Sequence, residues 1–342
     1  MTLAKGLIGA AMGVALGFAA MTTAQAGPTL DAVKKRGQLN CGVTTGVTGF
    51  SFPDDKGVWR GLDTDYCRAY AAAIFGDATK VHFVPLSSKD RFTALQSGDV
   101  DLLQRVTTWT MARDTTNGFN FGGIYFFDGQ GFLVPKKLGV KSAKNLDGAS
   151  ICIQQGTTTE LNAADYFRTN GIKVEPVVFG TASETIQAFG AGRCDAFTMD
   201  VSAIYSERLK LPNPDDYDVL PEVISKEPFA AVVRQGDDEW FDIVRWVHYA
   251  LVNAEELGVN KANVDERVKS ENPEIKRLLG VEGDYGKALG LEKDWAYQAV
   301  KQVGNYSELF DANVGKDSAL KISRGLNKLW NQGGLLFAPP IR

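Results

Sequence analysis

The residues with the clearest chemical potential form one polar loop that begins at Val106 and ends at Arg113. Arg113 offers a planar guanidinium with five donors. Hydroxyls and backbone N–H groups come from three threonines, Thr107, Thr108 and Thr110. Such donors could hold a carboxylate or a phosphate. Taken alone, the loop is equally compatible with a surface turn that carries an exposed arginine.

A second polar loop, Gln154–Glu160, has a comparable character. It contains Gln154 and leads through Thr157 and Thr158 into a predicted helix, whose free N–H groups and dipole favour an anion. Asp200 follows another predicted strand at the start of a helix. Its carboxylate suits a cationic ligand group, or serves only as a helix cap, because Asp is a favoured N-cap residue.

The elements that must position these loops alternate between strands and helices. Apolar segments bounded by turn residues predict strands at 39–43, 80–84, 100–103, 150–153, 173–179 and 194–198, with helices between them. This alternation predicts α/β units with parallel sheets and right-handed crossovers. Ligands of such sheets bind beyond the carboxyl ends of the strands, where the polar loops fall. A third loop there begins at Thr44.

The chain divides into two similar α/β series with a return segment. We expect a first lobe at 27–134, a second lobe at 135–228, and a return to the first lobe at 229–342 that ends in helices. Residues 119–134 predict one connecting strand, and residues 318–330 predict a late helix. The apolar stripe of the helix after Asp237 is expected to be core, so we assign no cofactor to it.

Residues 1–26 have the features of a cleavable export signal. Lys5 precedes an apolar segment, and Ala24-Gln25-Ala26 is a small-x-small cleavage site. The apolar segment is shorter than the roughly 20 residues of a membrane span, and no later segment is long and apolar enough. We therefore expect an exported, periplasmic chain that is not embedded in a membrane.

Charge and metal-ligand composition exclude several classes. One of the 37 Lys+Arg lies in the signal, so the remainder carries 36 positive against 41 negative side chains, or −5. Without a basic stripe, nucleic acids and anionic membranes are poor partners. The two histidines and four cysteines complete no plausible zinc set, so no metal is expected.

Four cysteines in an exported protein favour disulfides. Three pairings of Cys41, Cys67, Cys152 and Cys194 are possible. We favour Cys41–Cys67 and Cys152–Cys194, because each bond then falls within one lobe.

Several motifs now occur together in a specific order. They are Gln96–Asp101, Thr107–Arg113, Phe119–Tyr125, Gln155–Thr158, Gly192–Asp200 and Phe229–Val233. With them the sequence resembles the periplasmic solute-binding proteins of polar amino-acid ABC transporters (solute-binding protein family 3), and within these the general L-amino-acid branch. The resemblance implies a two-lobe, type II Venus-flytrap fold with a helical C-terminal extension on the first lobe.

The resemblance also implies roles for the polar loops. Arg113 would hold the ligand α-carboxylate together with Thr108, beside Val106 and Thr44 on the first lobe. Thr157 and Thr158, next to Gln154, would add donors from the second lobe, and Asp200 would take the α-ammonium group. Such a receptor acts as a monomer, uses no cofactor and delivers L-amino acids to a membrane permease.

Two departures from the family pattern bear on specificity. Thr44 and Val47 stand where close relatives carry an acidic and an aromatic residue, and Ser88 falls near a second family aromatic. Without these side-chain clamps we expect a roomy pocket with broad specificity.

The alternative is a periplasmic enzyme on the same fold, such as a dehydratase. It would need a cleft acid placed for proton transfer. Glu160 is the nearest candidate, although a solvent-facing helix position suits it better. No nucleophile elbow, phosphate-binding loop or zinc-protease motif occurs. Asp101 and Asp195 are expected to bond local backbone rather than a ligand.

Overall fold

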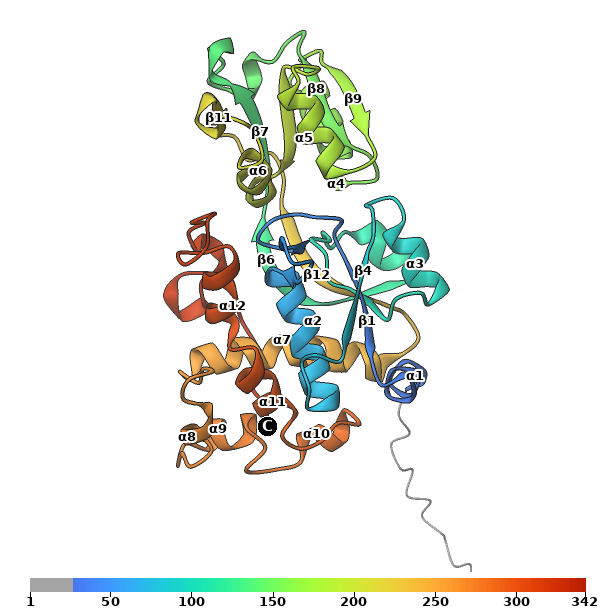
Figure 1. The fold of residues 1–342 in the computed structure, drawn as a ribbon, viewed down its shortest axis with the longest axis vertical. Coiled ribbons are helices and arrows are strands. Elements are labelled where there is room, and N and C mark those ends of the chain that lie inside the picture. The colour runs from blue at the N-terminus through green and yellow to red at the C-terminus, as the bar shows by residue number, and fades with distance from the viewer. Residues whose placement is uncertain (1–26) are drawn as a thin grey trace, which may run out of the picture.

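The computed structural model describes residues 27–342, so the predicted export signal lies outside the described residues. The described chain folds into two α/β lobes, one above the other, joined by two extended crossings (Figure 1). No helix within residues 27–342 is long and apolar enough to cross a membrane.

The first lobe is built on a mixed sheet with the strand order β4-β1-β5-β12-β6. Its parallel part pairs β1 with β4 and β5, and β12 then runs antiparallel to β5 and β6. The strands are β1 (Leu39–Val43), β4 (Val81–Pro85), β5 (Leu102–Leu103), β6 (Phe119–Asp128) and β12 (Glu227–Arg234). The helices are α1 (Pro28–Arg36), α2 (Leu62–Phe75), α3 (Arg91–Ser97) and α7 (Asp238–Glu256), and a small hairpin joins β2 (Phe52–Pro53) to β3 (Trp59–Arg60).

The second lobe has the sheet order β11-β7-β10-β8-β9. Here β8 pairs in parallel with β9 and β10, whereas β7 is antiparallel to β10 and β11. The strands are β7 (Gln130–Pro135), β8 (Ser150–Gln154), β9 (Glu175–Phe179), β10 (Ala196–Asp200) and β11 (Tyr217–Val219). The helices are α4 (Thr158–Thr169), α5 (Ala182–Gly190) and α6 (Val201–Arg208).

The chain passes between the lobes at Gly129 and again just before β12. The predicted single strand at 119–134 is wrong, because β6 and β7 belong to different sheets. The chain leaves the first sheet at Gly129, earlier than the boundary predicted at residue 134. A Cβ at Gly129 would lie 2.8 Å from the carbonyl oxygen of Ser225, so only glycine lets the two crossings pack this closely. Glu227 and Asp128 are register partners there.

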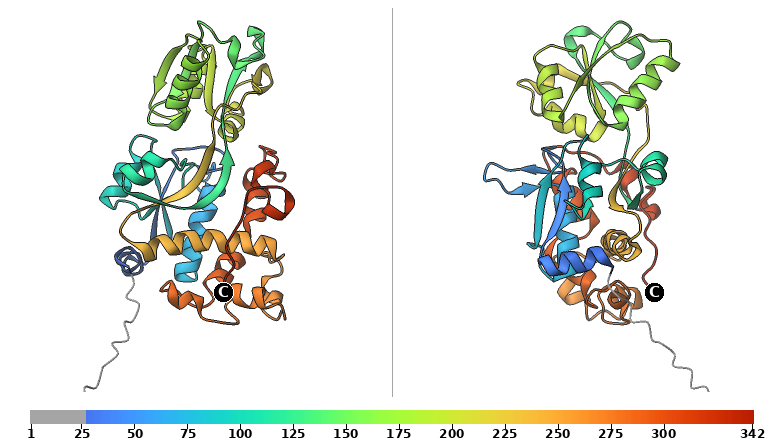
Figure 2. Two further views of the ribbon diagram at one scale, coloured as in Figure 1. Left: turned by 180° about the vertical axis from the view of Figure 1, so that it is seen from behind. Right: turned by 90° about the vertical axis from the view of Figure 1, so that its right-hand side faces the viewer.

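The C-terminal part covers the first lobe (Figure 2). Its core is α7, whose predicted apolar stripe from Trp240 to Leu251 is buried, as expected. The remaining helices are α8 (Val264–Arg267), α9 (Pro273–Leu278), α10 (Tyr285–Ala288), α11 (Trp295–Gln302) and α12 (Tyr306–Asn313).

The helix predicted at 318–330 is wrong, and α12 was missed. The segment 318–330 instead contains short 3₁₀ turns, and Asn327 uses its side chain to accept the N–H of Phe127 in β6. In α12, Asn305 and Glu308 form a capping box. That S/T/N-x-x-E signal was readable in the sequence.

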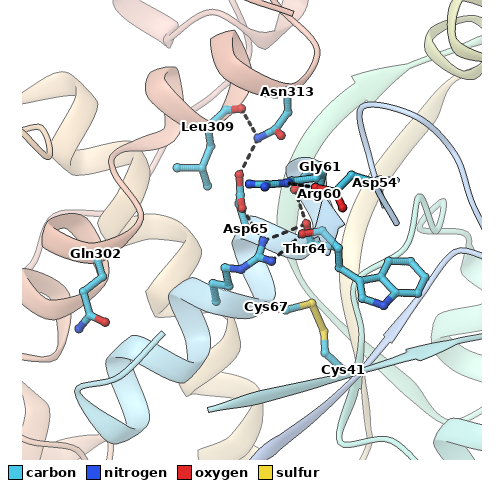
Figure 3. Close-up of polar contacts among 12 residues, drawn as sticks. Cys41, Asp54, Arg60, Gly61, Thr64, Asp65, Cys67, Gln302, Leu309 and Asn313 are labelled. Carbon is cyan, nitrogen blue, oxygen red and sulfur yellow. Dashed lines mark hydrogen bonds and ion pairs between the residues drawn. A yellow bond between two sulfur atoms is a disulfide. The ribbon is translucent and has the colours of Figure 1, made fainter. Parts of the chain in front are cut away.

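Both predicted disulfides are present. Cys41–Cys67 ties β1 to α2 with a Cα–Cα distance of 6.1 Å (Figure 3), and Cys152–Cys194 ties β8 to the turn before β10 at 5.6 Å. Figure 3 also shows Asn313 donating to Asp65 at 2.7 Å, which joins α2 to the C-terminal extension.

Helix α2 has no side-chain cap. The helix begins at Leu62 after Gly61, whose φ is +121°. Asp63 is therefore inside the first turn and fully buried rather than at the helix end.

Candidate ligand-binding site

The carboxyl ends of the parallel strands of both lobes face one another across a cleft. A small cavity of about 30 Å³ lies between them. Seven of the eight residues predicted to bind ligand line this cavity: Thr44, Val106, Thr108, Gln154, Thr157, Thr158 and Asp200. The eighth, Arg113, is not among the lining residues.

Arg113 instead lies behind the first-lobe wall. Its Nη1 donates to the carbonyl oxygen of Thr108 at 2.8 Å, and its guanidinium lies 5.3 Å from the ring centre of Phe92. Burial lowers the pKa of Arg113, while the carboxylates of Glu227 and Asp200 oppose this shift. Arg113 therefore supplies buried positive charge next to Thr108 without reaching the cavity in this arrangement.

The second-lobe loop forms a proper helix N-terminus. Thr157 is the N-cap of α4, and its Oγ1 accepts from the N–H of Glu160 at 3.2 Å. Glu160 turns its own carboxylate back to the N–H of Gly156 at 3.1 Å. That local bond, outside the cavity, removes Glu160 as a cleft acid.

Asp200 ends β10, and α6 begins at the next residue. It occupies the N-cap position but makes no side-chain capping bond, and its buried Oδ1 has no partner. Burial raises the pKa of Asp200 well above its usual value, and the neighbouring carboxylates of Glu227 and Asp128 raise it further. A cationic ligand group would relieve these costs, since an isolated buried carboxylate is unfavourable.

Thr44, Val106 and Gln154 have mainly local contacts. The Thr44 hydroxyl donates to the carbonyl oxygen of Ser51 at 2.8 Å, so its own loop occupies it. The Gln154 amide makes only a long 3.4 Å bond to the Gly180 carbonyl oxygen. Val106 has φ +41°, which is rare for a β-branched residue and typical of strain held at functional sites.

Sequence reasoning missed two arginines in the cavity wall, Arg91 and Arg105, each 3% exposed. Neither has an ion-pair partner within 4.0 Å anywhere in residues 27–342. Burial lowers the pKa of Arg105 to about 10, which still leaves it cationic at neutral pH. For Arg105 the available signal was an arginine two residues beyond the predicted strand 100–103.

Glu227, at the second crossing, was also missed. Its carboxylate accepts from the hydroxyls of Thr108 at 2.5 Å and Thr158 at 2.9 Å. It also accepts from Asn162 and Ser225, each at 2.6 Å. Because these donors come from both lobes, Glu227 connects the lobes at the hinge.

Two further bonds hold the lobes together. Lys210 Nζ of the second lobe donates to the Gly46 carbonyl oxygen at 2.9 Å, and Arg91 reaches the Gly156 carbonyl oxygen at 3.4 Å. The cavity of about 30 Å³ exceeds the roughly 10–15 Å³ that one water molecule needs, but it is far smaller than the roughly 300 Å³ or more of small-molecule pockets. An amino acid therefore needs more room than this arrangement of the lobes gives. No cluster of three metal-ligating side chains occurs in the described part of the chain.

A two-lobe α/β fold with a polar hinge cleft is the architecture of extracellular solute-binding proteins. The sequence pattern of the bacterial extracellular solute-binding proteins, family 3, matches residues 39–280, and the chain belongs to this family.

Named relatives resemble the chain over nearly its whole length. It is 56% identical to the general L-amino acid-binding periplasmic protein AapJ of Rhizobium johnstonii, over 98% of this chain and 99% of AapJ. It is 54% identical to the glutamate/glutamine/aspartate/asparagine-binding protein BztA of Rhodobacter capsulatus, over 92% and 93% of the two chains. Among solved structures, an ABC transporter/periplasmic binding protein from Brucella ovis with glutathione bound matches with a TM-score of 0.90 and 58% identity, over 92% and 99% of the two chains.

Proposed function

We propose that this protein is the periplasmic receptor of an ABC importer, and that it binds L-amino acids with broad specificity in the inter-lobe cleft. The proposal rests on one observation: the two lobes contribute opposite buried charges to the cleft. Buried arginines come from the first lobe, whereas the unpartnered carboxylate of Asp200 comes from the second lobe. A zwitterion matches both sides when it lies between them.

The proposed mechanism couples binding to closure. The Arg113 guanidinium turns from the Thr108 carbonyl oxygen toward the cleft and, with Thr108, holds the ligand α-carboxylate. The N-terminus of α4 at Thr157 and Thr158 adds N–H donors, and Asp200 takes the α-ammonium group. Since these groups lie on different lobes, the ligand stabilises the closed form over the open form. The Glu227 carboxylate accepts from the hydroxyls of Thr108 on the first lobe and Thr158 on the second, so it stabilises the same closed form.

The named relatives support this function. AapJ is named for L-amino acids in general and BztA for two acidic amino acids and their amides. The glutathione of the Brucella ovis structure carries a free α-amino-acid end as well. By the same reasoning we place the protein in the periplasm, as a monomer, with the permease of the importer as its partner.

The competing function is that of an enzyme on this fold. One observation favours it: burial raises the pKa of Asp200 in the cleft, as a proton donor would require. Recovery of the ligand distinguishes the two functions. A receptor returns the bound molecule unchanged after denaturation, whereas a dehydratase returns product, and mass spectrometry of the released ligand decides between them.

Calorimetric titration with the twenty L-amino acids, several D-isomers and glutathione tests the proposal. We expect one site per chain and binding of several L-amino acids, with weaker binding of the D-isomers because the ammonium group is then misplaced relative to Asp200. If none of these ligands binds, the proposed function is wrong.

A further inference from the structure

The first-lobe wall of the cavity holds more positive charge than an α-carboxylate needs. Besides Arg113 behind the wall, Arg91 and Arg105 line the cavity itself, and Asp200 is the acidic residue that lines it. An amino acid without a charged side chain would pair its α-ammonium group with Asp200 and its α-carboxylate with one arginine. At least one buried guanidinium would then remain without a ligand partner, at the considerable cost of a desolvated charge.

Of the two lining arginines, Arg105 has more unused donors. Only its Nη2 finds an acceptor, the Ser88 hydroxyl at 3.4 Å, while its buried Nε and Nη1 have no partner. Arg91 uses both terminal nitrogens, on the Thr107 hydroxyl and the Gly156 carbonyl oxygen, and only its Nε is unpartnered. Buried donors of native proteins are normally paired, so the free nitrogens of Arg105 indicate an absent acceptor.

Asp63 does not supply that acceptor. It makes no ion pair with Arg105 within 4.0 Å, and it accepts instead from the Tyr125 hydroxyl at 2.6 Å. Burial moreover raises the pKa of Asp63 to about 7, so it is partly protonated at neutral pH. Arg105 is therefore not explained as a counter-ion of the first-lobe core.

The neighbours of Arg105 indicate which group of the ligand it binds. Arg105 bonds Ser88 of the cavity wall, whereas Arg113 bonds Thr108, where the α-carboxylate is proposed to bind. The Thr44 hydroxyl of the same wall is occupied by Ser51. We propose that Arg105 binds a carboxylate at the far end of the ligand side chain, so that the receptor favours dicarboxylic L-amino acids such as glutamate and aspartate within its broad range. This inference rests on the proposed function, since it assigns the side-chain part of the same ligand site.

The experiment compares glutamate with glutamine, which has nearly the same shape and no second charge. Wild-type protein should bind glutamate at least about tenfold more tightly, the size of effect that a hydrogen bond to a charged group gives. Arg105→Met, which keeps an unbranched side chain and removes the donors, should bring the ratio of the two dissociation constants close to one. Because both ligands need the same closed fold, damage to folding or closure leaves this ratio unchanged.

Two further variants keep the test decisive. Arg105→Lys retains charge and should keep part of the preference, and it replaces Arg105→Met if the latter does not fold. Arg91→Met is the matched control, expected to weaken both ligands together.

The inference is overturned if wild type prefers glutamine or neither ligand, if the Arg105 variants keep the wild-type ratio, or if Arg91→Met alone removes the preference. If no amino acid binds at all, the proposed function fails and this inference fails with it. Tight binding of both ligands at equal strength overturns only the inference.

Discussion

The two lobes repeat one local design. In each, three parallel strands have the same order, β4-β1-β5 and β9-β8-β10, and an aspartate precedes the third strand. Asp101 bonds both backbone groups of Asn40, donating at 2.9 Å and accepting at 2.7 Å. Asp195 does the same with Ser150 at 2.9 and 2.8 Å. Both aspartates thus fix the start of a strand, as predicted, and do not reach the cleft.

The lobes differ at the other end of that third strand. Beyond β5 the first lobe presents Arg105, whereas β10 ends in Asp200. The same scaffold therefore delivers opposite charges to the two sides of one cleft. Neither Arg105 nor Asp200 has an ion-pair partner among the described residues of its own lobe. A zwitterionic ligand supplies a partner of opposite charge to each lobe. The strongest tests remove the charge of one lobe and ask which part of the ligand loses its partner.

Removal of Arg113 should have the largest effect. Arg113→Ala should weaken leucine and glutamine alike by about 2–5 kcal/mol, the usual cost of truncating one side of a buried charged pair, because all amino acids share the α-carboxylate. Calorimetry measures both affinities, and Arg168→Ala, whose side chain is 79% exposed, is the control. Wild-type binding of leucine by Arg113→Ala would remove Arg113 from the carboxylate site.

Asp200→Asn tests the opposite side. We expect a loss of about 1–2 kcal/mol for L-amino acids, since a hydrogen bond to a charged group is replaced by a neutral one. The corresponding 2-hydroxy acids lack the ammonium group and should lose much less. Competition binding with both series gives the comparison. Equal losses in the two series would show that Asp200 contacts something other than the ammonium group.

Glu227→Gln tests the contact between the lobes. The amide cannot accept from all four donors, Thr108, Thr158, Asn162 and Ser225, so the closed form should lose about 1–2 kcal/mol. Every ligand should then bind roughly tenfold more weakly, whatever its side chain. Small-angle scattering of the ligand-free variant should show a larger radius of gyration. An unchanged radius, with binding intact, would mean that Glu227 does not hold the lobes together.

The sequence predicted features that depend on local pattern. The start of a helix after Thr157 follows from local pattern, and the disulfide pairing follows from the division into lobes. Most of the cavity lining follows from the motifs that the sequence shares with the family. Arg105 and Glu227 were missed because their roles arise between distant segments. Glu227 lies 119 residues from Thr108 along the chain, and nothing near residue 227 indicates that a hydroxyl of the first lobe will contact it. Whether a buried charge lacks a partner is a property of the whole fold.

The smallest expected effect concerns Asp63, which lies behind the first-lobe arginines. Burial raises the pKa of Asp63 to about 7 from 3.8. The folded protein therefore binds more protons than the unfolded chain between those values, so this group favours folding below about pH 4 and loses that contribution as the pH rises to about 7. Asp63→Asn removes the titration and can still accept from Tyr125. Relative to the variant, wild type should gain roughly 1 kcal/mol of unfolding free energy from pH 8 to pH 6, since one pKa unit corresponds to about 1.4 kcal/mol. Urea unfolding at the two pH values measures this difference, and a gap that stays constant would show that Asp63 is ionised throughout and that Arg105 has a full counter-ion after all.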